Sequence, residues 1–271
     1  MRMVAGWKQY MDKEAGIGCY MAKKSFKNVF YPESEFGDFT DIDGTIAFFA
    51  RVNSILKPSF TVLDVGCGRG SYKDDTVGVR RNLRVLKGKA RQVIGIDVDE
   101  DARCNPFLDK FDLIKDNVWP VDDNSIDLIV CDNVLEHIEF PDNFFSEAGR
   151  VIRDGGYFCI RTPNLLNYIA LFSKLIPKKF HSKTMKIIKD TRKELDLFPT
   201  HYRCNTVAKI KSMMKKYGFK GVVYGYEAEP SYLSFSKFAY GIGVLHQRLA
   251  PKIFKPSIFA FGQIDKKGVF T

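Results

Sequence analysis

The sequence predicts an α/β fold with a mainly parallel sheet that is covered by helices on both faces. Short, continuous apolar segments recur between residues 61 and 164, and helical patterns separate them. Such an alternation is typical of parallel strands that are buried on both sides. A glycine-rich loop follows the first of these strands, and an acidic residue follows each of the next two. Because ligands bind at the carboxyl ends of parallel strands, we expect the functional site at that edge.

Length and composition indicate one large globular domain. The chain has 271 residues, of which 45% are hydrophobic and 27% charged, the balance of a folded protein. The uncharged run at 162–173 is shorter than the roughly 18 to 20 apolar residues of a membrane span. The first residues lack the apolar core of a signal peptide. We therefore expect a cytoplasmic protein.

Charge and cysteine content narrow the function classes. The net charge of +10 indicates an anionic partner, which could be nucleic acid, a phosphorylated substrate or a lipid surface. No pair of the six cysteines has the C-x-x-C spacing of a zinc or redox site. We interpret Cys67, Cys131 and Cys159, in or beside core strands, as small buried hydrophobes. No set of side chains has clear metal-ligand spacing, so no metal is predicted.

The predicted elements begin with an N-terminal cap over residues 1–42, which is mixed, aromatic and basic. A helix follows at 43–57, where Ile46, Phe49 and Val52 share one face. A second helix is predicted from Pro141 to Arg153, ending at Gly155-Gly156, because proline favours helix starts and glycine follows helix ends. The continuous apolar segments predict strands at 61–66, 92–98, 111–116, 126–134 and 156–162.

The second half of the chain completes the predicted sheet. Residues 165–205 are polar and basic and contain Pro177 and Pro199, which indicates an inserted lid. A helix follows, capped by Asn205 or Thr206 and stopped by Gly218. Two more strands at 221–227 and 257–264 bring the total to seven. The predicted organisation is one domain, with a cap at 1–42, a cofactor-binding half at 43–164, a lid at 165–205 and a C-terminal half at 206–271.

The glycine-rich loop raises the question of what lies against it. Gly66, Gly68 and Gly70 have the spacing G-x-G-x-G, whereas a dinucleotide site has G-x-G-x-x-G. Asp64 stands two residues before the first glycine. A carboxylate is unfavourable beside a pyrophosphate and suits a cationic group, such as the ammonium of an amino acid.

Two further acids follow strands at the same predicted edge. Asp97 ends the second strand, and a carboxylate there can accept both hydroxyls of a ribose. Asp116 follows the third strand and could bind an adenine amino group. Taken alone, Asp116 is more typical of a turn residue.

Together these motifs resemble those of the class I S-adenosylmethionine-dependent methyltransferases. The resemblance rests on "VLDVGCGRG", "GIDVDE", "DNSIDLIVCDNVLEHI" and "EAGRVIRDGGYFCIRTPN", within residues 61–164. It implies a Rossmann-like class I methyltransferase fold and S-adenosylmethionine as cofactor. By this resemblance the methionine part lies on Asp64, Gly66 and Gly68, the ribose on Asp97, the adenine on Asp116 and Asn117, and the sulfonium near Asn133. The full implied cofactor set is Asp64, Gly66, Cys67, Gly68, Gly70, Asp97, Val98, Asp116, Asn117 and Asn133.

The chemistry implied is an in-line displacement on a sulfonium carbon, for which the protein mainly aligns the reacting atoms. A hydroxyl acceptor must also lose a proton to a histidine or carboxylate. We predict His137 or His201 as this base, although His137 could equally have a capping or packing role. Tyr202 and Arg203 beside His201 could hold a phosphate or carboxylate.

Later segments are similar to methyltransferases of bacterial surface-polysaccharide pathways. The similar phrases are "RTPNLLNYIALFSKLIPKKFH", "DLFPTHYRCNT" and "EPSYLSFSKFAYGIGVLHQRL". They imply O-methylation of a sugar hydroxyl on a glycan or on its lipid- or nucleotide-linked precursor. A phosphate-bearing acceptor would agree with the positive charge.

An apolar row at helical spacing lies near the C-terminus. Its members are Phe235, Phe238, Ile242, Leu245 and Leu249. We expect it to pack on the sheet or on a second subunit. The alternative is peripheral contact with the inner face of the cell membrane, in which anionic lipid would meet Lys237, Arg248, Lys252 and Lys255.

Three other functions remain open. A nucleic-acid methyltransferase agrees with the charge, but "CDNVLEH" is unlike the Asx-Pro-Pro-aromatic motif of base methylators, and no nucleic-acid module is visible. A small-molecule methyltransferase for a quinone or secondary metabolite would have a mostly apolar, aromatic-lined pocket. A protein that binds the cofactor without catalysis would keep the same three acids.

Overall fold

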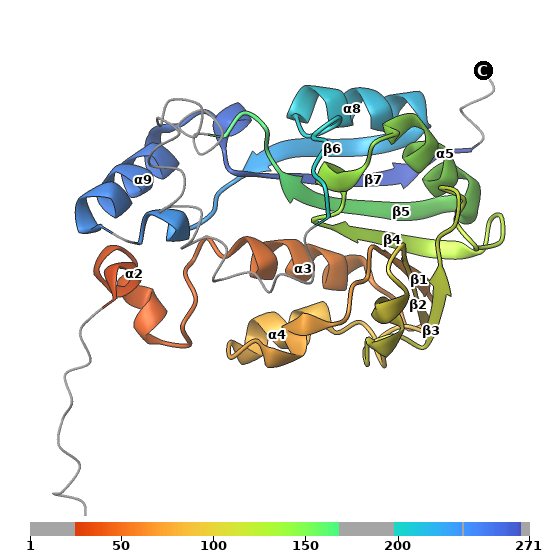
Figure 1. The fold of residues 1–271 in the computed structure, drawn as a ribbon, viewed down its shortest axis with the longest axis horizontal. Helices are drawn as coiled ribbons and strands as arrows, with labels where there is room; N and C mark the ends of the chain where they lie inside the picture. Colours follow the sequence, from red (N-terminus) through yellow and green to blue (C-terminus); the bar gives the residue numbers. More distant parts are fainter. Residues whose placement is uncertain (1–24, 168–197, 235, 267–271) are drawn as a thin grey trace, which may run out of the picture.

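The sheet has the predicted seven strands and mainly parallel order (Figure 1). The computed structural model describes residues 25–167, 198–234 and 236–266. The strand order is β3-β2-β1-β4-β5-β7-β6, and only β7 runs antiparallel to its neighbours. The strands are β1 (Thr61–Val65), β2 (Gln92–Asp97), β3 (Lys110–Leu113), β4 (Ile126–Asp132), β5 (Ile152–Pro163), β6 (Phe219–Tyr226) and β7 (Ser257–Ile264).

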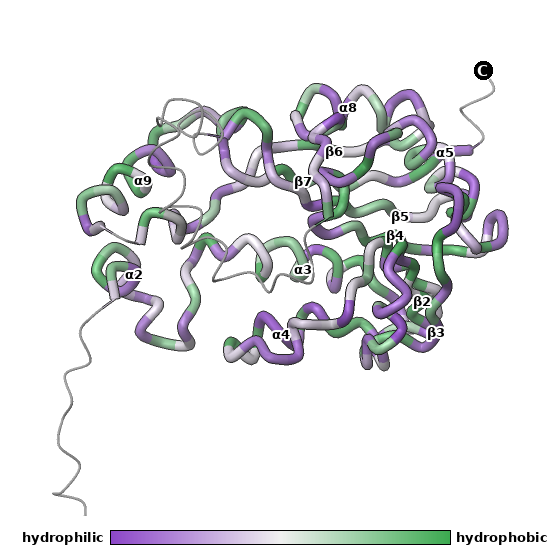
Figure 2. The backbone as a smooth tube through the Cα atoms, in the orientation of Figure 1, coloured by the Kyte–Doolittle hydropathy of each residue, from purple (hydrophilic) through white to green (hydrophobic). Residues whose placement is uncertain are grey.

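Helices cover both faces of this sheet, as predicted (Figure 1). On one face, α3 (Gly44–Ile55) and α4 (Gly78–Arg84) join a core that contains Phe48, Val52 and Leu128. On the other, α5 (Pro141–Val151) and α8 (Val207–Lys216) join a larger core around Phe145 and Phe158. Burial of these apolar side chains is the main favourable term in folding. The strands in Figure 2 are largely hydrophobic in colour.

Strand order places the loops after β1, β2 and β4 at one edge. β1 lies between β2 and β4, with Val65 paired to Ile96 and to Cys131. The chain passes from β1 to β2 and β3 on one side, and then crosses to β4 and β5 on the other. Such a reversal opens a crevice beyond the carboxyl ends of the strands. The fold therefore brings the glycine loop and the acidic strand ends together.

Side-chain caps set the starts of two of these helices. The Asp43 carboxylate accepts from the backbone N–H groups of Thr45 and Ile46, each at 2.9 Å, at the start of α3. Thr206 caps α8 by accepting from Lys209 N–H, and Gly218, with φ +77°, follows its end. These caps satisfy N–H groups that have no partner within the helix.

The predicted end of the helix that starts at Pro141 is wrong. α5 ends at Val151, and Gly155-Gly156 lies inside β5. β5 pairs with β4 through a register shift between Ile126 and Leu128. The Arg153 guanidinium donates to the Asp127 carboxylate of β4 at 2.7 Å. Pairing with β4 at Ile152 and again from Tyr157 therefore keeps the two glycines, which locally resemble a helix stop, inside a strand irregularity.

The expectation that the C-terminal apolar row packs on the sheet is also wrong. Phe238 and Leu249 on α9 (Lys237–Leu249) are 79% and 73% exposed. The opposite face of α9 is buried, with Tyr240 against Tyr31 beside α2 (Phe26–Phe30). Lys255 does not face outward, because it is only 7% exposed and pairs with Glu227. Phe235 lies outside the described residues.

The remaining predictions are met in part. Cys67, Cys131 and Cys159 are buried thiols, as predicted. Most of the predicted lid, 168–197, and the first 24 residues of the cap lie outside the described residues. Within the described ranges, no helix is both long and apolar enough to cross a membrane. Short 3-10 turns complete the fold: η1 (Pro32–Glu35), η2 (Ser71–Asp74), η3 (Glu100–Cys104), η4 (Leu135–His137), η6 (Ser231–Leu233) and η7 (Lys252–Phe254).

Phe158 of β5 offers a direct test of the larger core. Its side chain is fully buried, and its ring lies 5.2 Å from Phe219 and 5.8 Å from Phe145, between ring centroids. We expect Phe158→Ala to lower the free energy of unfolding by about 3–5 kcal/mol, because it leaves a cavity that the helices cannot fill. Urea denaturation measures this loss. The control Val222→Ala, at an exposed position of β6, should change stability by less than about 1 kcal/mol; equal losses would contradict the assignment of the core.

Candidate functional site

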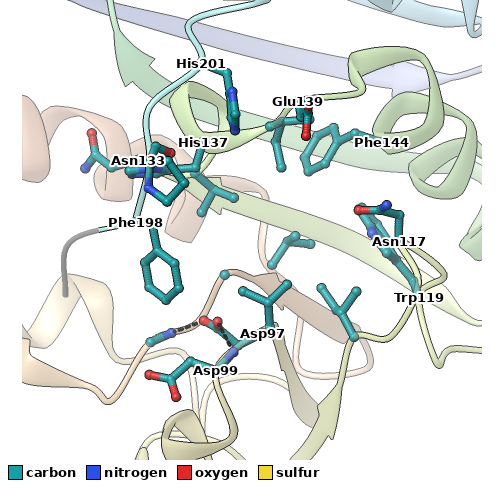
Figure 3. Close-up of a pocket in the computed structure, with 18 of the residues that line it drawn as sticks. Asp97, Asp99, Asn117, Trp119, Asn133, His137, Glu139, Phe144, Phe198 and His201 are labelled. Atoms are coloured by element: carbon teal, nitrogen blue, oxygen red, sulfur yellow. Dashed lines mark hydrogen bonds between the residues drawn. The ribbon is translucent and has the colours of Figure 1, made fainter. Parts of the chain in front are cut away.

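A cavity of about 480 Å³ opens at the carboxyl edge of the sheet. Figure 3 shows Asp97 and Asp99 on one wall, opposite His137 and His201. The loops after β1, β2, β3 and β4 and the segment 198–201 form its walls. Of the residues predicted to act at the site, the cavity brings together Gly66, Gly68, Asp97, Val98, Asn117, Asn133, His137 and His201.

The three glycines of the loop have different reasons for lacking a side chain. All have positive φ, at +65°, +53° and +68°, where side chains are unfavourable. A Cβ on Gly66 would lie 2.3 Å from Val134 Cγ2, and one on Gly70 would lie 2.6 Å from Asn105 Oδ1. A Cβ on Gly68 would meet nothing within 4 Å. Gly66 and Gly70 are therefore required by packing, whereas Gly68 leaves its backbone open to the cavity.

The Asp97 carboxylate is fixed beside this loop and still has lone pairs that accept no hydrogen bond. One carboxylate oxygen accepts from Gly68 N–H at 2.9 Å, and the other accepts from Asp99 N–H at 3.0 Å (Figure 3). The side chain lines the cavity and the residue is 7% exposed. An ionised carboxylate has about four lone-pair sites. About two remain for a ligand, and a pair of neighbouring hydroxyls fits them.

Asp64 does not line the main cavity. It faces a smaller adjoining cavity of about 40 Å³, together with Cys67, Tyr72, Arg84 and Asp132. Among the described residues, no side chain or backbone group hydrogen-bonds to its carboxylate. Burial, followed by the nearby charge of Asp132, raises the pKa of Asp64 to about 7. The charge of Arg84 acts in the opposite direction but does not offset the burial.

A cationic side chain lies in the same small cavity. The Arg84 guanidinium stands over the Tyr72 ring, 4.3 Å from its centroid, and 3.6 Å from an Asp132 oxygen. Its Nε is buried and has no hydrogen-bond partner in the described part of the chain. Burial raises the pKa of the Cys67 thiol above its ordinary value, so this side chain of the small cavity stays neutral. The small cavity therefore contains both a carboxylate and a guanidinium with unused bonding capacity.

The loop after β3 contributes a different residue than the one expected. Asn117 lines the cavity, but Asp116 does not. Both residues have positive φ, at 52° and 58°, and the Asn117 carbonyl accepts from Asn143 at 2.7 Å. The apolar side of this wall, which Ile114, Trp119 and Phe144 form, was not predicted. The tryptophan in "DNVWP" was the available signal, since a lone aromatic among polar residues indicates a buried contact.

Asn133 lies directly after β4, where it was predicted. Its φ is +57°, and its backbone N–H donates to the Arg161 carbonyl at 2.8 Å. Its side-chain amide donates to Asp132 at 3.0 Å. A left-handed asparagine at this point turns the chain across the cavity.

His137 has a defined tautomer. Its Nδ1 lies 2.9 Å from the Pro199 carbonyl oxygen, and because a carbonyl only accepts, Nδ1 carries the proton. The lone pair of the neutral ring is therefore on Nε2. Nε2 lies 4.0 Å from a carboxylate oxygen of Glu136, whose pKa burial raises.

Buried polar contacts fix the position of Glu136. Its carboxylate accepts from Thr162 Oγ1 at 3.0 Å, and the Asn205 amide donates to the same Thr162 oxygen at 2.6 Å. The Glu136 carbonyl accepts from both His201 N–H and Tyr202 N–H. Tyr202 has φ +51°, a conformation that costs energy in a bulky residue. The two bonds to the Glu136 carbonyl attach segment 198–203 to η4. The Asn205 side chain bonds to Thr162 instead of capping α8.

The remaining wall was not predicted. Ile138, Phe140, Phe198 and Pro199 make the side of the cavity around the histidines mainly apolar, and no periodic pattern in the sequence marks them. Arg203 is exposed and does not line the cavity. In the described ranges, no group of three His, Cys, Asp or Glu side chains is placed to hold a metal.

Comparison with known proteins agrees with this geometry. Residues 39–224 match the methyltransferase domain family. A probable S-adenosylmethionine-dependent methyltransferase of Mycolicibacterium smegmatis is 34% identical over 111 residues, which are 40% of this chain and 39% of that protein. The ubiquinone biosynthesis O-methyltransferase of Hydrogenovibrio crunogenus is 27% identical over 57% of this chain and 67% of its own length. The chain thus spans about two-fifths of the first of these relatives.

A solved structure shares the fold. The S-adenosylmethionine-dependent methyltransferase from Archaeoglobus fulgidus superposes with a TM-score of 0.52 at 18% identity, over 85% of this chain and 97% of that one. At this level of identity the likeness shows the fold. Because the family model matches residues 39–224, more than half of the chain, the chain belongs to the methyltransferase domain family.

Proposed function

We propose that this protein transfers the methyl group of S-adenosylmethionine to a hydroxyl of a small, largely apolar acceptor. The observation that carries the proposal is the open cradle at Gly68. Its backbone faces the cavity without a side chain in the way, directly beside a carboxylate with unused lone pairs. Such an arrangement fits a nucleoside whose ribose and sulfur must approach the chain closely.

The cofactor's nucleoside part is assigned to three neighbouring groups. Asp97 accepts hydrogen bonds from the ribose hydroxyls. The flat adenine ring lies against the apolar lining that Val98, Trp119 and Phe144 contribute to the cavity. Asn117, rather than Asp116, lines the same cavity, so we assign the adenine edge to its amide.

The amino-acid part is assigned to the small adjoining cavity. Asp64 and Asp132 supply negative charge for an ammonium, and the buried Nε of Arg84 offers a donor to a carboxylate. Gly66 borders both cavities, so one ligand can extend from one to the other. Cys67 and Gly70 shape the loop without taking a direct part.

When bound, the cofactor supplies an electrophilic methyl group on a sulfonium. The chain must then align an acceptor oxygen and remove its proton. The Nε2 lone pair of His137 takes that proton, while Pro199 holds the ring and Glu136 stabilises the charged imidazole. Asn133 borders the cavity on the β4 side and limits the position of the acceptor.

The wall around His137 supports an apolar acceptor. Ile138, Phe140, Phe198 and Pro199 present aromatic and aliphatic surface, which suits a phenolic or quinone-like ring. The similarity to a ubiquinone biosynthesis O-methyltransferase supports the same class. The second candidate is a sugar hydroxyl of a glycan or of its lipid- or nucleotide-linked precursor. His201, Glu139 and Asn143 favour it, because they add polar groups to the same wall.

Replacement of Asp97 tests the proposed cofactor site. We expect Asp97→Ala to weaken S-adenosylmethionine binding about a hundredfold or more, since two charge-assisted hydrogen bonds are lost. Isothermal titration calorimetry measures the affinity. Asp99→Ala is the matched control, because Asp99 borders the same cavity but pairs with Arg69 at 2.7 Å. Wild-type protein that binds neither S-adenosylmethionine nor S-adenosylhomocysteine would refute the function itself.

The raised pKa of Asp64 leads us to expect that cofactor affinity depends on pH. With a pKa of about 7, the carboxylate that attracts the ammonium is lost as the pH falls. We expect affinity to drop about tenfold between pH 8 and pH 6, and Asp64→Asn to bind weakly and without this dependence.

The same pKa has the opposite effect on the stability of the ligand-free protein. A folded pKa above the ordinary value of 3.8 means that the native state loses stability as the pH rises from about 4 to about 7. Asp64→Asn should therefore gain stability over the wild type at pH 8 more than at pH 5, in thermal unfolding. A constant difference in stability between those pH values would contradict the raised pKa.

Replacing each of the two histidines in turn tests which of them is the base. We expect His137→Ala to lower kcat by about 10²–10⁴-fold while calorimetry finds unchanged cofactor affinity. His201→Ala, on the same wall, should cost much less. The assay follows S-adenosylhomocysteine release with a catechol and with a nucleotide-linked hexose as acceptors. Turnover of the hexose alone would establish the sugar function, and a larger loss in His201→Ala would move the base to that residue.

A further inference from the structure

An exposed row of apolar side chains runs along α9. Phe238, Ile242, Leu245 and Leu249 are 47–79% exposed. At about 100° per residue they fall within about 60° of the helix circumference, over a length of about 16 Å. The buried side chains of α9, Tyr240 and Gln247 among them, lie on the opposite side. Figure 2 shows α9 largely in the hydrophobic colour.

A shallow groove beside this row widens the apolar surface. Its volume is about 550 Å³, and it is lined by Phe30 of α2 and by the α9 residues Lys237, Phe238, Gly241, Ile242 and Leu245. A Cβ on Gly241 would lie 3.3 Å from the Phe30 ring, so the glycine keeps the two helices close. Ile253 of η7, which is half exposed, follows the row. A contiguous apolar face of this kind marks an interaction surface.

The charges on α9 and η7 are positive. Residues 237–255 contain Lys237, Arg248, Lys252 and Lys255 and no acidic residue. The first three are exposed, whereas Lys255 is used internally by Glu227. The neighbouring segment carries exposed acids, which are Glu33 and Glu35 of η1 and, after it, Asp38, which pairs with Lys27. The apolar row is therefore accompanied by exposed cations without nearby acids on its own helix.

We propose that this face, formed by α9, η7 and Phe30, docks on the surface of an anionic lipid bilayer. The apolar row enters the interface, and Lys237, Arg248 and Lys252 meet the lipid headgroups. The positive charges of this face argue against a second copy of the chain as its binding partner. In a two-fold dimer the same patch faces itself, so the three cations of each subunit would oppose one another. Lipid headgroups of negative charge complement them.

The docking face and the cavity belong to the same edge of the sheet. Asn164, directly after β5, donates to the carbonyls of Ile253 and Lys255 at 2.7 and 2.8 Å. Thr162, at the end of the same strand, bonds to Glu136 beside the cavity. Figure 1 shows α9 and α2 together beyond this end of the sheet. Docking would thus bring the cavity near the lipid, a consequence that holds whichever acceptor is used.

Vesicle flotation tests the proposal without any assay of activity. The 271-residue chain is mixed with vesicles of phosphatidylcholine alone, or with about one-third phosphatidylglycerol, at roughly 50 and 500 mM NaCl. We expect flotation with the anionic vesicles at low salt, weaker flotation at high salt, and none with neutral vesicles. The double variant Phe238→Ser/Leu245→Gln should reduce the bound fraction about tenfold or more, since both side chains leave the interface.

Matched variants separate docking from other effects. Val222→Gln removes an exposed apolar side chain of β6 and should float like the wild type. Lys237→Gln/Arg248→Gln should bind less than Lys211→Gln/Lys215→Gln, which removes the same charge from α8. Circular dichroism and cofactor affinity check that each variant is folded. No flotation of the wild type at low salt, equal flotation of all variants, or an α9 variant that changes only a dimer seen by light scattering would overturn the proposal.

Discussion

The ion pair between Asp132 and Arg161 underlies the rest of the site. The two side chains bond bidentately at 2.6 and 2.7 Å across the carboxyl ends of β4 and β5, and each is 9% exposed. The third guanidinium nitrogen donates to Thr45 of α3 at 2.6 Å, so one residue joins two strands and a helix. Breaking a buried pair of this kind costs about 3–5 kcal/mol, because the remaining charge stays desolvated. The pair therefore fixes the edge from which Asn133 and η4 begin.

That pair also explains why Asp64 can remain without a partner. Asp64 and Asp132 lie in one small cavity, and two adjacent carboxylates favour a proton on one of them. Arg161 is committed to Asp132, so the energetic cost falls on Asp64, whose pKa rises to about 7. The charged form of Asp64 is therefore unfavourable in the folded, ligand-free chain. Asp127, by contrast, accepts hydrogen bonds from the Thr61 N–H and from Arg153.

The sequence could predict the strands and the loops at their ends, because buried parallel strands have continuous apolar runs and the site needs glycine and acid directly after them. The sequence could not predict features that depend on contacts between segments far apart in the chain. The spacing of Phe238 to Leu249 indicates two unlike faces of a helix, but contact with Tyr31 decides that Tyr240 is buried. Gly155-Gly156 resembles a helix stop, but β4 pairs with the chain on both sides of these glycines and keeps them within β5. Trp119 and Phe198 line the cavity from irregular segments, where no periodic pattern exists to mark them.

The net charge of +10 was the reason to expect a phosphate-bearing acceptor, and the distribution of charge around the cavity argues otherwise. Three acids, Asp97, Asp99 and Glu139, line it. Among the described residues of the lining, Arg69 is the only arginine or lysine, and it pairs with Asp99 and Asp101. A phosphate there would meet more negative than positive charge. Exposed cations lie instead on α9 and η7, at Lys237, Arg248 and Lys252, and none of the three lines the cavity. The positive charge of the chain therefore gives no reason to place a phosphate in the cavity.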